Sequence, residues 1–217
     1  MGIAERRQRE KERRRNEIID AAEKVFSSKG FDRATMDDVA EQAELSKGTL
    51  YLYFKNKEEL YLAVNERGFR ILQKMFREAA AQARTGLEKV YAIGQAYFRF
   101  HIQYEDYYNA MVYYESHQID YSDDDSCAMA CDRQGEKALE VLVEAIRAGI
   151  EDKSIRPDVE PFKMAIVLWG QSTGIIQISL LKGAHIEEKH GIHFEEVVEL
   201  SFDIIKRALQ NTEKQEK

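Results

Sequence analysis

The chain has 217 residues, of which 44% are hydrophobic and 33% charged, and its formal net charge is -7. These totals suit one large or two small globular domains, and the negative charge argues against a protein that coats nucleic acid without sequence preference. The two cysteines, Cys127 and Cys131, lie four residues apart, which suits neither a fold-spanning disulfide nor a four-ligand zinc site. We therefore expect a protein of a reducing, cytoplasmic compartment with inert thiols; oxidant sensing is the alternative.

Charge is distributed unevenly along the chain. Residues 1–15 hold seven Arg or Lys and three Glu, a net charge of +4, so the remaining residues carry -11. This asymmetry suits a small DNA-binding head on a larger body that avoids DNA; a solvated, partly disordered basic tail is the other interpretation. The same residues lack the apolar core of a signal peptide, and we do not expect secretion.

Hydrophobic periodicity predicts an all-α chain, because helical spacing recurs and no run alternates for long. The first helix is expected from Asn16, with a left-handed glycine, Gly30, at its end. Thr35 and Asp38 resemble a capping box, which predicts a second helix of about two turns.

Ser46 is placed to cap a third helix, in which Leu50 and Phe54 face inward. Asn56 is placed to cap a fourth helix, which continues to about Ala83. Further helices are expected at residues 87–104, 106–117, 127–152, 160–182 and 194–210. Exposed or polar breaks are expected at residues 120–126, 154–161 and 183–193.

The third expected helix has the residue types of a DNA-reading helix. Its first turn combines unbonded N–H groups, a cation, a glycine and a hydroxyl, all of which suit close approach in a major groove. Tyrosines on a face expected to meet solvent can reach phosphate oxygens or a thymine methyl. A solvated lysine and a purely capping threonine are the alternatives for the flanking residues. The predicted DNA-binding residues are Thr35, Ser46, Lys47, Gly48, Thr49, Tyr51, Tyr53 and Lys57.

Residues 16–60 resemble the tetracycline-repressor (TetR/AcrR) family of bacterial transcription regulators. The resemblance lies in F-S-S-K-G-F-D-R-A-T-M-D-D-V-A followed by S-K-G-T-L-Y-L-Y-F-K-N-K-E-E-L. It implies an all-α homodimer whose third helix enters the major groove of double-stranded DNA, and repression that a small ligand relieves. The family's usual DNA-contacting positions correspond to Lys47, Thr49, Tyr51, Tyr53 and Lys57. We expect a basic arm at 1–15, a helix-turn-helix domain at 16–60, and a ligand-binding and dimerisation domain at 61–217.

Aromatic residues are dense between Tyr91 and His117. A buried tyrosine needs a hydrogen-bond partner, and aromatic walls with a few polar tips suit a flat or hydrophobic small molecule. A plain aromatic core is the alternative. The predicted effector-binding residues are Phe98, His101, Tyr104, Tyr108, Met111 and Tyr114.

The stretch from Met164 to Leu181 is the most apolar of the chain. Its internal Gln, Ser and Thr residues favour a helix buried on two sides over a membrane span. Paired with the last helix across a two-fold axis, it would form a four-helix dimer interface, as the family resemblance also implies. The predicted interface residues are Leu168, Gly170, Gly174, Ile178, Val198, Phe202, Ile205 and Leu209.

Other constellations are weak. His185, His190 and His193 lie near two glutamates, but their spacing defines no single helix face, so we expect no metal site. No phosphate loop, nucleophile elbow or catalytic carboxylate pair occurs, and we expect neither an enzyme nor a cofactor. The predicted function is a ligand-responsive repressor acting on a palindromic operator. Two alternatives are an effector-independent architectural DNA binder and a hydrophobic-ligand enzyme with a vestigial head.

Overall fold

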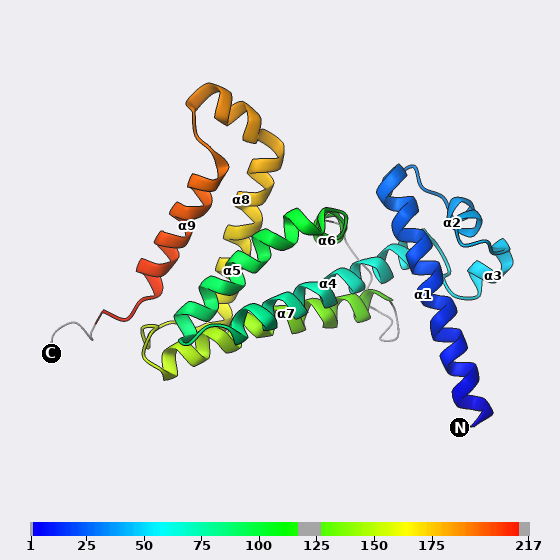
Figure 1. The fold of residues 1–217 in the computed structure, drawn as a ribbon, viewed down its shortest axis with the longest axis horizontal. Helices are drawn as coiled ribbons and strands as arrows, with labels where there is room; N and C mark the ends of the chain where they lie inside the picture. Colours follow the sequence, from blue (N-terminus) through cyan, green and yellow to red (C-terminus); the bar gives the residue numbers. More distant parts are fainter. Residues whose placement is uncertain (1, 117–126, 213–217) are drawn as a thin grey trace. The chain divides into compact units, whose positions relative to one another are not determined.

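The computed structural model describes residues 2–116 and 127–212, and it confirms the all-α prediction (Figure 1). The helices are α1 (Ile3–Lys29), α2 (Met36–Gln42), α3 (Lys47–Tyr51), α4 (Lys57–Ala81), α5 (Gly86–Gln103), α6 (Glu105–Ser116), α7 (Cys127–Glu151), α8 (Pro161–His190) and α9 (Phe194–Leu209). Within the described ranges, extended pairing is limited to one isolated bridge between Ile155 and Gln210. The aspartate-rich break expected at residues 120–126 lies outside the described residues.

Helix α1 begins at Ile3, so the start expected at Asn16 and the alternative of a disordered basic tail were wrong for these residues. The first half of α1 is made of Ala, Arg, Lys, Glu and Gln, which are strong helix formers. Neighbours four apart also interact, since Gln8 donates a hydrogen bond to Glu12 at 3.0 Å. The helix ends at Gly30, whose φ of +74° suits a residue without a side chain.

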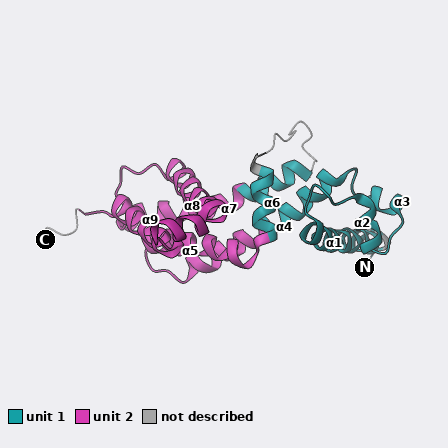
Figure 2. Cartoon of the chain, turned by 90° about the horizontal axis from the view of Figure 1, so that it is seen from above, with its two compact units in different colours: residues 1–69, 106–135 teal, residues 70–105, 136–217 magenta. Residues whose placement is uncertain are grey.

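The chain divides into two compact units (Figure 2). Unit 1 comprises Met1–Phe69 and Asp106–Gly135, and unit 2 comprises Arg70–Glu105 and Glu136–Lys217. Unit 1 therefore contains more than the expected head of residues 16–60, because α6 packs on it. A Cβ added at Gly68 would lie only 3.0 Å from Tyr107 of α6. The functional boundary after residue 60 stays a prediction.

Unit 2 is built around α5, which contacts α8 and α9. The ring of Phe202 in α9 packs against Tyr91 at 4.6 Å and Phe98 at 5.7 Å between ring centroids. At the start of α5, a Cβ added at Gly86 would lie 2.0 Å from the backbone nitrogen of Gly149 in α7. Bulkier residues would therefore separate these two helices.

Helix α8 runs eight residues beyond the end expected at Lys182, and the polar break expected at 183–193 is helical as far as His190. Polar composition did not end the helix, because Ala184, Glu187, Glu188 and Lys189 are good helix formers, and Lys189 and His190 lie favourably in its last turn. Gly191, at φ +63°, ends it. At the start of α8, Pro161 occupies the first turn, where a proline is favourable because its missing N–H would have no partner within the helix.

Candidate nucleic-acid interface and effector site

The turn between α2 and α3 fixes the orientation of α3 within unit 1. Glu44 adopts a positive φ of 55°, and the backbone nitrogen of Leu45 donates to the carbonyl of Ala40 at 2.9 Å. Leu50 and Phe54 are completely buried in the core of the head. One face of α3 is therefore held by apolar packing, and the opposite face remains at the surface.

Two predicted hydroxyl residues act as helix caps. Thr35 Oγ1 accepts from the nitrogen of Asp38 at 3.2 Å, and Asp38 Oδ2 accepts from the nitrogen of Thr35 at 3.0 Å, which completes the predicted capping box. The pKa of the Asp38 carboxyl is lowered, first by its hydrogen bond from Lys29 and then by those from Thr35. Ser46 Oγ accepts from the nitrogen of Thr49 at 3.2 Å. Both hydroxyls are exposed and already serve the fold.

The surface face of α3 presents a cation, a glycine and an aromatic ring. Lys47 and Gly48 are exposed, and the side chain of Tyr51 is 50% exposed. Lys47 Nζ lies 2.5 Å from Asp37 Oδ2 in an ion pair whose two members are each more than half exposed. The next residue, Leu52, is 82% exposed, and we had not predicted it as a contact. In the sequence, the position of Leu52 directly after Tyr51 could have indicated an exposed apolar residue beside α3.

Tyr53 and Lys57 are less exposed than their predicted role suggested. Tyr53 follows the end of α3, is half-buried and packs on the head core, so the expectation that it faces solvent was wrong. Lys57 Nζ donates to the carbonyl of Phe31 at 2.8 Å and lies 4.3 Å from the centre of its ring. It also reaches the carbonyl of Asp32 at 3.3 Å. Lys57 therefore stabilises the turn between α1 and α2, and a phosphate would compete for its ammonium group.

Helix α6 joins this head through polar and aromatic contacts. Tyr107 donates its hydroxyl hydrogen to Glu23 Oε1 at 2.7 Å, and Arg67 of α4 donates to the same oxygen at 2.8 Å. Tyr113 packs on Phe31 at 4.8 Å and on Tyr61 at 5.4 Å between ring centroids. Helix α6 thus contacts Phe31, which lies in the turn between α1 and α2 that Lys57 stabilises.

The six predicted effector residues are divided between the two units. In unit 1, Tyr108, Met111 and Tyr114 of α6 are buried. In unit 2, Phe98 is buried against Phe202, as the aromatic-core alternative proposed for such residues.

The other two predicted effector residues of unit 2 are partly accessible. Burial lowers the pKa of His101, with Glu105 opposing the shift, so the setting favours the neutral imidazole. Tyr104 is 36% exposed and stacks on Phe100, with 5.6 Å between ring centroids. His101 and Tyr104 therefore each carry a polar group next to apolar neighbours.

One buried polar residue of unit 1 was missed. Asn65 of α4 is completely buried, and its Nδ2 donates to the carbonyl of Ala110 in α6 at 3.2 Å. Its Oδ1 has no hydrogen-bond partner among the described residues. A buried acceptor without a donor costs free energy, which sets this oxygen apart from the paired polar atoms around it. The signal in the sequence was a polar residue directly after the inward-facing Ala63 and Val64.

The predicted dimer residues fall into two groups. Leu168, Phe202 and Leu209 are buried inside unit 2 and belong to the core of this chain, which corrects their assignment to a surface. The others retain accessible surface, and Ile178 is 56% exposed. Exposed apolar residues that we had not named adjoin them on α8 and α9. These are Phe162, Ile166, Val167, Trp169, Leu180, Leu181, Val197, Leu200 and Ile204.

Helix α8 is exposed to an unusual degree for its composition. Within the described part of the chain it is the one helix long and apolar enough to cross a membrane, and 22% of its most apolar window is buried. This chain therefore covers only part of the helix, and the expected second covering, by a partner, stays a prediction. An exposed apolar face of this size requires another covering.

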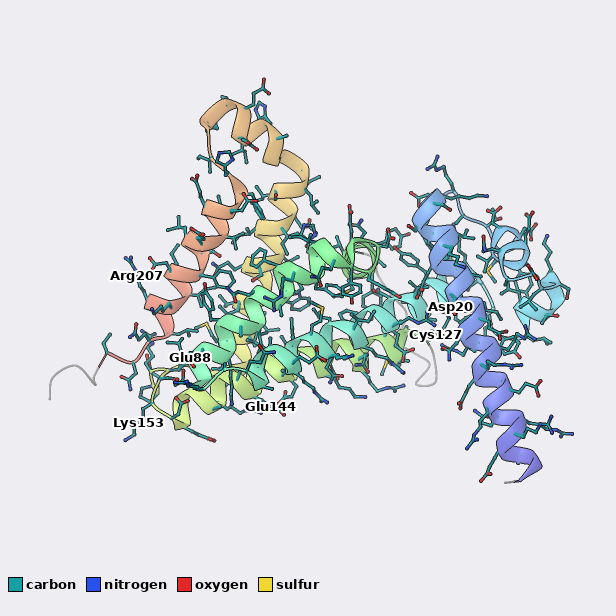
Figure 3. All side chains as sticks on the ribbon, in the orientation of Figure 1. Asp20, Glu88, Cys127, Glu144, Lys153 and Arg207 are labelled. Carbon is teal, nitrogen blue, oxygen red and sulfur yellow. The ribbon has the colours of Figure 1, made fainter. Side chains whose placement is uncertain are left out.

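The remaining constellations do not form a reactive site in the described ranges. Burial raises the pKa of the thiols of Cys127 and Cys131, which makes both poor nucleophiles. His193 Nδ1 lies 3.1 Å from Glu187 Oε1, as a simple pair. No group of three or more His, Cys, Asp or Glu that could hold a metal ion occurs among the described residues. Side chains across both units are shown in Figure 3.

Known proteins resemble both parts of the chain. Residues 18–64 match the family described as "Bacterial regulatory proteins, tetR family", and residues 90–201 match "Tetracyclin repressor-like, C-terminal domain". The transcriptional activator FasR of Mycolicibacterium smegmatis is 36% identical over 90 residues, 42% of this chain and 41% of its own length. The repressor KstR2 of the same species is 26% identical over 147 residues, 68% of this chain and 70% of its own length.

Solved structures show the same fold. The regulator FadR of Bacillus subtilis, in complex with stearoyl-CoA, is 19% identical and has a TM-score of 0.68, covering 88% of this chain and 97% of its own. The chain spans 36% to 41% of the length of its first curated relatives. Together, the two domain matches show that this chain belongs to the tetracycline-repressor family of bacterial transcriptional regulators.

Proposed function

We propose that the protein is a homodimeric, cytoplasmic repressor that binds a palindromic operator and is released by a small hydrophobic effector. The observation that carries the proposal is the two-sided character of α3: Leu50 is completely buried, whereas Lys47, Gly48 and Tyr51 are exposed. A helix held on one face and polar on the other can enter a major groove without unfolding its core. Members of the family are named as both activators and repressors, so the sign of regulation is part of the proposal.

Dimerisation is supported by the apolar surfaces of α8 and α9. Ile178 is 56% exposed, Leu181 79% and Leu200 59%, and a second copy of the chain would cover them. Gly170 and Gly174 have nothing within 4 Å of an added Cβ, which leaves room for a partner helix. In a two-fold dimer the two copies of α3 would face half-sites roughly 34–36 Å apart.

The effector is proposed to bind near α6, where buried apolar residues surround the side chain of Asn65. Asn65 Oδ1 supplies an acceptor for a ligand donor. The fold neighbour FadR was solved with stearoyl-CoA, which makes acyl-CoA thioesters the first class to test here. Because Tyr107 and Tyr113 of α6 contact the head, a ligand that favours a different position of α6 would shift the population of head conformations.

The test is fluorescence anisotropy on the promoter fragment upstream of the protein's own gene. Tyr51→Ala should weaken binding by about 10-fold or more, and Tyr51→Phe separates the contribution of the hydroxyl from that of the ring. Lys47→Ala should weaken binding, whereas Lys137→Ala, an equal charge change at an exposed site on α7, should not. An absence of specific binding by the parent protein, at any salt concentration, would refute the proposal.

Ligand response is tested separately, by thermal shift with stearoyl-CoA, isovaleryl-CoA, free fatty acids and planar aromatic compounds. A binder should raise Tm in a concentration-dependent way and lower the affinity for the promoter. A response to none of these compounds, with specific DNA binding intact, would favour the effector-independent architectural protein.

A further inference from the structure

A row of cations continues the inward face of α1 beyond the core of the head. Ile18, Ala22 and Val25 occupy the apolar face of α1 and are buried in the head core. Counting back at the same spacing of three or four residues, the next positions are Arg14, Lys11 and Arg7. We name Arg7, Lys11 and Arg14 the cationic stripe. One face of a single helix therefore changes from apolar to positively charged where the core ends.

The acidic residues of α1 lie away from this stripe. At about 100° per residue, Glu5, Glu10, Glu12 and Glu17 all fall roughly a quarter turn or more from the middle of the apolar face. Arg6, Arg9 and Arg13 lie on the opposite side of the helix, and the seventh cation, Arg15, lies 5.2 Å from the centre of the Phe54 ring. The net charge of +4 in residues 1–15 is thus not spread evenly, because one face holds cations alone.

The stripe lies on the same side of α1 as the DNA-reading elements of unit 1. Helix α2 packs on α1, residues of α1, α2 and α3 share one buried core, and Figure 1 shows the first half of α1 extending beyond both α2 and α3. Arg7 and Lys11 are exposed, and neither forms an ion pair with a described residue. Arg14 is half-buried, with its NH1 2.8 Å from Glu17 Oε2.

We propose that the cationic stripe binds phosphates of double-stranded DNA beside the half-site that α3 reads. The inference rests on the proposed function, since it needs the head to approach DNA. Charge complementarity favours a polyanion as the partner: residues 16–217 carry -11, whereas residues 1–15 carry +4, and the stripe is the face of this segment that holds cations without acidic neighbours. Continuity with the face that packs α2 and α3 makes DNA, rather than an anionic lipid surface, the partner.

The proposed contacts have a measurable signature. Each neutralised phosphate adds about 0.9 to the slope of log affinity against log salt concentration, so three contacts contribute about 2.7. Between 50 and 200 mM salt, the parent should therefore lose ~40-fold more affinity than a protein without the stripe. Phosphates carry no base identity, so the preference for operator over random DNA should change little.

The experiment compares two triple variants of the full chain that remove the same charge from opposite faces of α1. The stripe variant is Arg7→Gln, Lys11→Gln and Arg14→Gln. The control variant is Arg6→Gln, Arg9→Gln and Arg13→Gln. Each removes one arginine that pairs with Glu17, because Arg13 Nε lies 3.6 Å from Glu17 Oε1 and Arg14 pairs with its other oxygen. Far-UV circular dichroism should show equal helix content in both.

Affinity is measured by anisotropy on the own-promoter fragment and on versions shortened at the flanks. We expect the salt slope to fall by about two to three in the stripe variant and by less than about one in the control. Flank shortening should weaken the parent and leave the stripe variant unchanged. Equal slopes in the two variants, or stripe-dependent binding to phosphatidylglycerol vesicles with DNA affinity unchanged, would overturn the inference while leaving the proposed function intact. A parent that binds no DNA specifically would overturn both.

Discussion

The hydroxyl of Tyr107 in α6 donates to Oε1 of Glu23 in α1 across 2.7 Å, so the two helices share a hydrogen bond within unit 1. Burial and this bond together raise the pKa of Tyr107 well above its ordinary value. Because the acceptor is a carboxylate, Tyr107→Phe should lower the free energy of unfolding by roughly 1.5–3 kcal/mol in urea titrations. Tyr51→Phe, at a half-exposed ring, is the matched control and should change stability by less than about 0.5 kcal/mol. Equal effects of the two changes would contradict the bond's contribution.

Alkaline pH should destabilise the head through Tyr61. Burial, followed by the neighbouring charges of Tyr113, Asp106 and Asp32, raises the pKa of Tyr61 to about 12. In the unfolded chain a tyrosine ionises near pH 10, so its contribution to stability is complete below about pH 10 and is lost as pH rises to about 12. The check is urea unfolding at several values between pH 9 and pH 12. Tyr61→Phe should flatten this pH dependence, and an unchanged slope would contradict the assignment.

Substitution of Lys57 should lower the stability of the protein more than substitution of Lys47, although both lysines belong to the proposed interface. Lys57→Met keeps the alkyl stem but leaves the carbonyls of Phe31 and Asp32 without their donor, which should cost about 1–3 kcal/mol of unfolding free energy. Lys47→Ala removes an exposed ion pair and should cost less than about 1 kcal/mol. Both should weaken DNA binding. Thermal unfolding and anisotropy on the same samples measure the two effects, and equal stability losses would refute this division.

Charge on the apolar face of α9 should prevent dimerisation. Leu200→Glu places a carboxylate on a side chain that is 59% exposed in the single chain, so the protomer should fold normally but fail to bury that charge against a partner. Sedimentation velocity should then show a monomer with reduced operator affinity. Ile102→Glu, at a 75% exposed position on α5, is the control and should remain dimeric. A dimer in both variants would place the interface elsewhere.

Two glycines should respond to alanine in opposite ways. Gly86→Ala puts a Cβ 2.0 Å from the backbone nitrogen of Gly149, a contact that only helix separation relieves, and should cost ~3 kcal/mol or more. Gly174→Ala meets nothing within 4 Å of its own chain and should stabilise a monomeric Leu200→Glu background by about 0.5–1 kcal/mol. In the parent dimer the same change should weaken self-association if the partner helix crosses there. Sedimentation and urea unfolding measure both, and a stabilised, undiminished dimer would exclude Gly174 from the interface.

Local signals predicted the helices well. Thr35, Ser46 and Asn56 cap the helices that follow them, as expected, because capping depends on a few neighbouring residues. The start of α1 was missed because an exposed, charged helix has no apolar period to detect. The extension of α8 was missed for the same reason.

Residue roles were harder to predict than helices. The apolar stripe of α9 is wide, and its sequence does not distinguish Phe202, which packs inside unit 2, from Leu200, which faces outward. For Lys57, the carbonyls that it binds lie 25 and 26 residues away in the chain, so no local pattern reveals them. Asn65 required knowledge of α6, because its amide binds the carbonyl of a residue 45 positions later.

Because α1 is one continuous helix, a small rotation of the head moves the end of its exposed half by a larger distance. From Ile18 in the core to Ile3 the helix rises about 22 Å, so tilting the head by about 10° would move the tip by about 4 Å. That displacement is about the axial spacing of phosphates along one DNA strand. A small turn of the head would thus carry the far end of α1 out of register with the backbone, and the leverage would amplify an effector's signal at the flank of the operator.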